Sequence, residues 1–195
     1  MANKQQQRTR QTATFFAQKP AKKALVQLTA EPGVSFHLKD VDLLKLLADT
    51  KQPLSVYIFK VSVLAVSIGL SVALLTNFIF PNAESPDFEL GIIFIIGAVI
   101  FGPITESLLM IPIIYLIRKM TSNIVYTSLI SALVWGGLHS LQVPLWGVGV
   151  FALFFLLSMA YQYWDNHSRK YALFVVTAIH ALNNATVVII SAFES

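Results

Sequence analysis

Long apolar stretches separated by short polar segments make up the chain after residue 54. The five stretches cover residues 55–80, 88–118, 123–139, 143–163 and 171–193. A helix rises about 1.5 Å per residue and a bilayer core is about 30 Å thick, so each stretch can span it, the third only just. The pattern predicts an all-α membrane protein, a polytopic helical bundle of about five transmembrane helices.

Two prolines lie inside the second stretch. Pro103 and Pro112 each lack the main-chain N–H that an uninterrupted helix uses. The stretch is also longer than a straight helix needs to cross the bilayer. We therefore expect a tilted or kinked helix there.

The composition agrees with residence in a membrane. Hydrophobic residues make up 55% of the chain and charged residues 12%, which is unusual for a soluble domain of this length. The chain has no cysteine, and this excludes disulfides, thiolate metal sites and cysteine nucleophiles.

Residues 1–54 form a basic segment of different character. It holds nine of the fourteen Lys and Arg residues and no acidic residue before Glu31. Such a segment is typical of a cytoplasmic tail near anionic lipid, while nucleic-acid binding and an organelle transit peptide are alternatives. Within it, "DVDLLKLLADT" has the apolar spacing of a short interfacial helix. The predicted division is this N-terminal segment followed by a membrane-embedded domain at 55–195.

Charges in the loops between the stretches predict the orientation. The first loop, "PNAESPDFEL", has three acids and no Lys or Arg. The second loop contains Arg118 and Lys119, and the fourth contains Arg169 and Lys170. Because basic loops stay on the cytoplasmic side, we expect the N-terminus in the cytoplasm and the C-terminus outside.

Few ionisable side chains lie deep within the stretches, away from their ends on the membrane surfaces: Glu106 in the second, His139 in the third and His180 in the fifth. Counted from the cytoplasmic ends, they lie about 18, 24 and 14 Å deep, and Asn184 lies about 20 Å deep. Polar groups at such depth are costly and usually face a protein interior or a cavity. We expect the four side chains to meet around one cavity.

The spacing of these residues favours shared chemistry. His180 and Asn184 are four residues apart on one helix face, and Trp135 and His139 have the same relation. In a low-dielectric site the Glu106 carboxylate can act as general base for a water. Imidazole and amide groups can donate to a developing oxyanion.

Structural explanations compete for individual residues. A single intramembrane histidine is often an interhelical hydrogen-bond partner, Asn183 is expected to pack or bond between helices, and Trp135 can belong to an aromatic core. Gly136 and Gly137 can let a neighbouring helix or a substrate backbone approach closely. The combination of a carboxylate, two imidazoles and an amide is what favours a reactive site.

Three short motifs resemble those of the CPBP family of glutamic-type intramembrane proteases, the CAAX protease and bacteriocin-processing (Abi) group. "GPITESLLMIP" is similar to the family's Glu-Glu-x-x-x-Arg motif, "WGGLH" to its Phe-x-x-x-His motif and "HALNN" to its His-x-x-x-Asn or Asp motif. The motifs occur in the family's order over residues 88–193. The resemblance implies that the domain at 55–195 is protease-like.

The resemblance also implies a role for each motif residue. Glu106 and His139 would activate a water, and His180 and Asn184 would stabilise the oxyanion of the tetrahedral intermediate. This chemistry uses neither a metal ion nor a cofactor.

The chain departs from the family pattern at four positions. Ser107 replaces the second glutamate, Ile111 the arginine and Pro112 the glycine that follows it. Trp135 replaces the phenylalanine of the second motif. The first two changes remove a pair that would orient the site, and they leave the groups that would touch the water in place.

We therefore predict an intramembrane endopeptidase, a hydrolase of a membrane-associated peptide or protein in the lipid bilayer of a bacterial cell (inner) membrane. Nothing in the sequence indicates a prenylated substrate, and we expect no nucleic-acid partner. The main alternative is a non-catalytic member that acts by binding, such as a bacteriocin immunity protein. A metalloenzyme that uses two histidines and a glutamate, and a proton-coupled transporter, are further alternatives.

Overall fold

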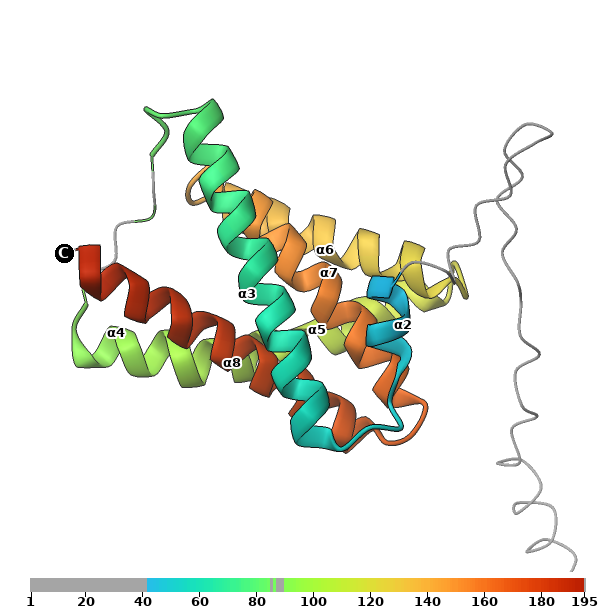
Figure 1. Ribbon diagram of the computed structural model, residues 1–195. Coiled ribbons are helices and arrows are strands. Elements are labelled where there is room, and N and C mark those ends of the chain that lie inside the picture. The colour runs from blue at the N-terminus through green and yellow to red at the C-terminus, as the bar shows by residue number, and fades with distance from the viewer. Residues whose placement is uncertain (1–41, 85, 87–89, 195) are drawn as a thin grey trace, which may run out of the picture. The chain divides into compact units, whose positions relative to one another are not determined.

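Helices account for most of the residues that the computed structural model describes, which are 42–84, 86 and 90–194 (Figure 1). The elements are α2 Asp42–Ala48, α3 Leu54–Ile79, α4 Ile92–Ile96, the π-helix η2 Gly97–Phe101, α5 Gly102–Arg118, α6 Ile124–Ser140, α7 Trp146–Asp165 and α8 Arg169–Glu194. This part of the chain contains no strand. The predicted all-α bundle is confirmed.

Four helices are long and apolar enough to cross a membrane. They are Leu54–Ile79, Ile92–Arg118, Trp146–Asp165 and Arg169–Phe193. The third predicted stretch forms the shorter apolar helix α6, which at 17 residues is about 25 Å long. The chain is a multi-pass membrane protein.

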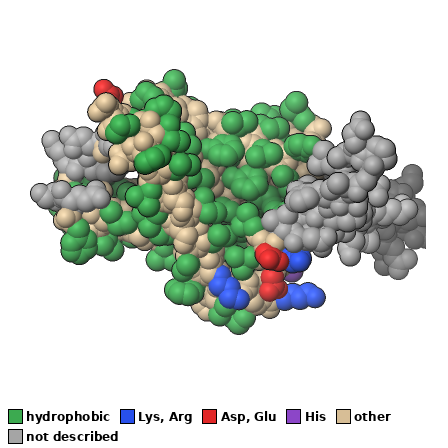
Figure 2. Space-filling model, turned by 45° about the horizontal axis from the view of Figure 1, so that its top comes forward, with side chains coloured by type: hydrophobic (Ala, Val, Ile, Leu, Met, Phe, Trp, Pro, Cys, Tyr) green, Lys and Arg blue, Asp and Glu red, His purple; other side chains and the backbone are tan. Residues whose placement is uncertain are grey.

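Large apolar side chains cover the outward surfaces of the helices. Phe78, Ile93 and Phe193 are each at least 85% exposed. Figure 2 shows a face made mostly of hydrophobic side chains, with most of its charged side chains gathered at one end. Such a continuous apolar surface is suited to lipid rather than to water.

Helix α7 is the central element of the bundle. It packs against α2, α3, α6 and α8. The core that surrounds it is apolar and aromatic, and its largest fully buried members include Tyr57, Met110, Ile114, Phe154, Leu157, Met159 and Ile179. Because α7 is the helix with the most buried residues, its side chains determine how the outer helices are placed.

Helix α2 is attached to this core. Leu47 is fully buried, and the Tyr57 hydroxyl donates to its carbonyl oxygen at 2.9 Å. The Tyr57 ring meets Trp164 edge-on, with centroids 5.2 Å apart. The predicted helix in "DVDLLKLLADT" is therefore present, whereas its interfacial location and a domain boundary at residue 54 stay predictions. All described residues belong to one unit, His37–Ser195, and most of the basic tail lies outside them.

The second predicted stretch is irregular near Pro103. Helix α4 changes to π-helical geometry at Gly97, and α5 begins at Gly102, directly before the proline. Pro112 lies inside α5, which continues to Arg118. This change of helical register lies one turn before Glu106, and the tilt or kink expected from the two prolines stays a prediction.

Polar side chains join the inner helices. The Ser158 hydroxyl on α7 donates to the Ser131 hydroxyl on α6 at 2.9 Å, and the Gln162 amide donates to the Ser128 hydroxyl at 2.9 Å. All four side chains are buried. Hydrogen bonds of this kind hold helices together where lipid provides no hydrophobic driving force.

Helices α6 and α7 also approach each other closely at two glycines. A Cβ built on Gly136 would lie 2.8 Å from the Gly147 carbonyl oxygen and 3.1 Å from the Phe151 Cβ. A Cβ on Gly147 would collide with the Gly136 carbonyl and the Ser140 hydroxyl. Gly137 faces open space. Of the two glycines Gly136 and Gly137, Gly136 is therefore the one at which another helix approaches closely. That helix is α7.

Ion pairs gather the ends of three helices on one side. Arg118 at the end of α5 lies 3.4 Å from the Asp165 carboxylate at the end of α7. Arg169 at the start of α8 lies 3.6 Å from the same carboxylate. The basic residues of the second and fourth loops thus lie on the same side of the bundle, as expected if both loops are on one side of the membrane. Which side that is stays a prediction.

Single cysteines at Asn82 and Lys119 will test the orientation, since the chain has no cysteine of its own. Both positions are exposed, one before α4 and the other after α5. In intact cells we expect a membrane-impermeant maleimide to label Asn82→Cys and not Lys119→Cys, because basic loops stay in the cytoplasm. Labelling of Lys119→Cys without Asn82→Cys would show the opposite orientation.

Substitution at the helix crossing will test the packing of α6 on α7. Gly147→Ala places a methyl group against the Gly136 carbonyl and should destabilise the protein by about 1–3 kcal/mol. Gly149→Ala on the same helix has nothing within 4 Å and is the matched control. Thermal unfolding in detergent measures both variants, and equal midpoints would contradict the crossing.

Candidate functional site

Glu106 and His180 meet between α5 and α8. The Glu106 Oε2 lies 3.8 Å from the His180 Nε2, which is within ion-pair range and longer than a direct hydrogen bond. The Glu106 side chain is 26% exposed, whereas His180 is 3% exposed. The carboxylate is therefore accessible from outside the bundle, and the imidazole approaches it from the interior.

Besides Glu106, the aromatic side chain of Phe154 lies against His180. The His180 ring meets the Phe154 ring edge-on, with centroids 5.3 Å apart. Its Nδ1 is buried and has no hydrogen-bond partner among the residues that the structure describes. A buried polar atom of this kind has the capacity to bind a water or a substrate group.

His139 is also a neighbour of Phe154. The centroids of these two rings are 6.4 Å apart, and Phe154 also stacks on Trp135 at 4.5 Å. Both histidines therefore lie against one phenylalanine from α7. The sequence carried no signal for this residue, because Phe154 is one of several phenylalanines in the uniform run "FALFFLL".

A hydrogen bond within α6 determines which nitrogen of His139 carries a proton. Nδ1 lies 2.9 Å from the Trp135 carbonyl oxygen. A carbonyl only accepts, so Nδ1 donates and the Nε2 of a neutral ring is left with a free lone pair. The ring also meets Trp146 edge-on, with centroids 4.8 Å apart. His139 is thus held in an orientation that leaves Nε2 able to accept a proton.

Asn184 points to the main chain of the π-helical turn. Its Nδ2 donates to the Ala98 carbonyl oxygen at 2.9 Å, and its Oδ1 lies 3.5 Å from the Asn183 Nδ2. His180, one turn earlier on α8, faces the Glu106 carboxylate instead. The two residues therefore share a helix face but contact different groups of the neighbouring segment.

The arrangement brings a base and several donors into one apolar region. Glu106 and His180 are in contact, His139 and His180 flank one aromatic ring, and Asn184 is bonded one turn away. Electrostatic interactions are stronger in such surroundings than in water. A carboxylate and an imidazole can there activate a water or stabilise developing charge. The predicted catalytic roles of these residues stay predictions.

Of the four departures from the family pattern, Ser107, Ile111 and Trp135 fall on buried or half-buried positions. Ser107 is fully buried, and its hydroxyl has no partner within the described residues. Ile111 is partly buried and packs against the hydrophobic core. These positions therefore contribute small or apolar side chains to the packing and no charge.

Within residues 42–84, 86 and 90–194, no three His, Cys, Asp or Glu side chains lie together closely enough to hold a metal ion. Glu106 and the two histidines therefore do not form a ligand set in this arrangement.

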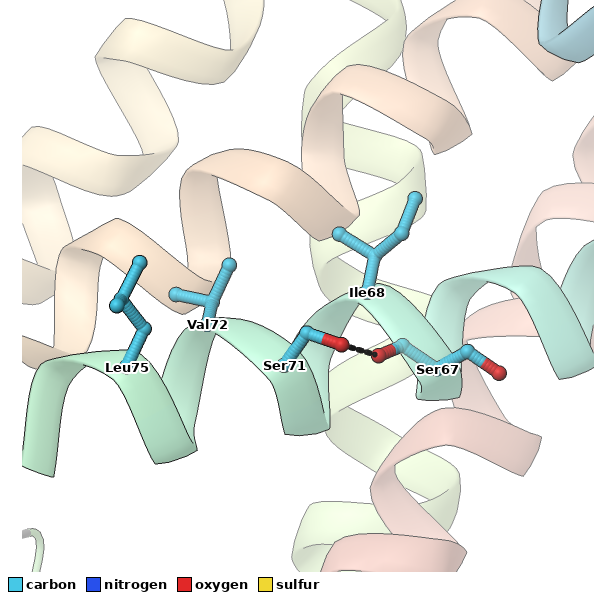
Figure 3. A pocket seen from close by; sticks show the side chains of 5 residues that line it. All are labelled: Ser67, Ile68, Ser71, Val72 and Leu75. Carbon is cyan, nitrogen blue, oxygen red and sulfur yellow. Dashed lines mark hydrogen bonds between the residues drawn. The ribbon is translucent and has the colours of Figure 1, made fainter. Parts of the chain in front are cut away.

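A shallow groove lies elsewhere, on α3. Its lining residues are Ser67, Ile68, Ser71, Val72 and Leu75. Figure 3 shows the three apolar side chains pointing to the same side of the helix, and the Ser71 hydroxyl bonded to the Ser67 carbonyl at 2.8 Å. Neither Glu106 nor any other candidate residue lines this groove.

Comparison with known proteins identifies the family. The family model of the type II CAAX prenyl endopeptidase Rce1-like proteins matches residues 88–186, which include all four candidate residues. No curated protein and no solved structure matches the chain. The match covers half of the chain and contains the three motifs in their order. The chain belongs to the Rce1-like family of type II CAAX prenyl endopeptidases, a protease family of the CPBP group.

Proposed function

We propose that the protein is an intramembrane endopeptidase that hydrolyses a peptide bond with a water activated by Glu106 and His139. One observation carries the proposal: in a member of a protease family, the Glu106 carboxylate lies 3.8 Å from the His180 imidazole within an apolar helical bundle. A carboxylate at this depth is costly to maintain, and a hydrolytic role explains its presence.

The reaction begins at the partly exposed Glu106 carboxylate. Glu106 takes a proton from a water that His139 Nε2 orients, and the water oxygen bonds to the substrate carbonyl carbon. His180 and Asn184 donate to the resulting oxyanion. Asn184 does so with the amide hydrogen that is not bonded to the Ala98 carbonyl. When the C–N bond breaks, Glu106 passes its proton to the leaving amine. The hydroxyl group stays on the new carboxyl group.

The substrate class is a membrane-associated peptide or protein. Glu106, His180 and Asn184 lie on helices long enough to span a bilayer, so a substrate must reach them from lipid or along the membrane surface. Gly137 offers an exposed, open position on α6 two residues before His139, where a substrate backbone has room to approach. We place the protein in a bacterial cell membrane with its N-terminus in the cytoplasm.

A second candidate function is binding without catalysis, as in immunity to a bacteriocin. Ser107 and Ile111, at the positions of the family's second glutamate and arginine, favour it because both are packed and uncharged. Under this reading the Glu106–His180 contact serves only to join α5 to α8.

Substitution of Glu106 separates the two functions. Glu106→Gln keeps the size of the side chain and removes the proton acceptor, so we expect the fold to persist and proteolysis to be lost. Complementation of a deletion strain measures the loss, and Glu84→Gln in the exposed loop before α4 is the matched control. Full complementation by Glu106→Gln would rule out the protease and leave the binding protein.

Metal removal separates the glutamate mechanism from a metalloenzyme. We expect cleavage by the purified protein to be unchanged after treatment with EDTA and 1,10-phenanthroline, because the described residues form no three-ligand site. Loss of activity with a chelator and its recovery with added Zn²⁺ would contradict this expectation.

A further inference from the structure

In the π-helical turn η2, the register places the Ala98 carbonyl opposite a residue that has no N–H to donate. The Gly102 N–H donates to the Gly97 carbonyl, five residues earlier. In the same register, the Ala98 carbonyl would accept from the N–H of residue 103. Residue 103 is proline and has no N–H. Because lipid offers no donor either, the Ala98 carbonyl needs a partner from elsewhere in the protein.

Asn184 supplies that partner. Its Nδ2 lies 2.9 Å from the Ala98 oxygen, and both residues are half-buried. The bond joins α8 to η2 across 86 positions of the sequence. A side-chain amide from a neighbouring helix is one of the ways in which a proline-containing membrane helix regains a lost hydrogen bond.

The bond and the Glu106–His180 contact lie one helical turn apart on α8, whereas Ala98 precedes Glu106 by eight residues, about two turns. Glu106 follows Pro103 by three residues on α5, and His180 precedes Asn184 by four residues on α8. The Ala98 bond and the 3.8 Å contact therefore connect the same two segments, one turn apart on α8 and about two turns apart on η2 and α5. A change in the separation of α8 and η2 will also change the distance between Glu106 and His180.

We propose that Asn184 is a positioning residue: its amide replaces the hydrogen-bond donor that Pro103 lacks and thereby keeps His180 beside Glu106. The importance of Asn184 for catalysis rests on the proposed protease function. The hydrogen bond from its amide to the Ala98 carbonyl is independent of that function. The role adds to oxyanion donation, since the amide has two hydrogens and Ala98 takes one.

The proposal predicts that Asn184 and Pro103 are coupled. Asn184→Ala should lower the midpoint of thermal unfolding in detergent by roughly 2–5 °C, because the Ala98 carbonyl loses its donor. In a Pro103→Ala background, Asn184→Ala should lower the midpoint of thermal unfolding by much less. There the new main-chain N–H of residue 103 can donate to the Ala98 carbonyl in the π register.

Pro112→Ala is the matched control. Pro112 lies in the same helix α5, nine residues nearer to its end, and does not affect the donor to Ala98. Asn184→Ala should therefore lower the midpoint of thermal unfolding by the same amount in the Pro112→Ala background as in the wild-type protein. An equal cost of Asn184→Ala in the wild-type and Pro103→Ala backgrounds would overturn the proposal.

A spectroscopic measurement tests the effect on the site without using activity. Solid-state NMR of protein in lipid, with ¹³C-labelled glutamate and ¹⁵N-labelled histidine, reports the dipolar coupling between the Glu106 carboxyl carbon and the His180 ring. We expect Asn184→Ala to weaken the coupling and the Pro103→Ala/Asn184→Ala double variant to restore it. An unchanged coupling in Asn184→Ala would overturn the positioning role. Failure of the proposed protease function would change neither measurement.

Discussion

A polar side chain inside a bilayer is tolerated when it has a polar partner, and the Glu106–His180 contact meets this requirement for both residues. The two atoms are 3.8 Å apart and belong to α5 and α8, whose sequences are otherwise mostly apolar. Separation of these helices would leave a carboxylate and a buried imidazole unpaired. The contact therefore both joins the two helices and concentrates reactive groups at one place, and the remaining packing serves to maintain it.

Helix α7 provides that packing. Phe154 contacts the His139 and His180 rings, so one aromatic side chain sets the spacing of the two imidazoles. The glycines at 136 and 147 bring α6 against α7 one turn from His139. Close helix approach through small residues is the usual way to pack helices in a membrane, and here it also places a candidate catalytic histidine. Packing and chemistry thus depend on the same crossing.

The helices and the candidate residues could be predicted from the sequence because hydropathy and depth are local properties. The predicted stretches 55–80 and 171–193 became Leu54–Ile79 and Arg169–Glu194. Phe154 could not be predicted, since nothing distinguishes it from its apolar neighbours. The partner of Asn184 could not be predicted either. The partner is the Ala98 carbonyl oxygen, which the π register places opposite Pro103, a residue that has no N–H to donate. Helical register depends on contacts that are distant in the sequence, so the π turn could not be predicted.

Hydrolysis by Glu106 is the central claim, and it can be measured without knowing the substrate. Membranes from a deletion strain are incubated in H₂¹⁸O with purified wild-type or Glu106→Gln protein, and mass spectrometry identifies new peptide C-termini that carry ¹⁸O. A water-activating glutamate predicts a set of labelled C-termini that appears with the wild-type protein and is absent with Glu106→Gln. Identical sets of labelled peptides for the two proteins would contradict the account.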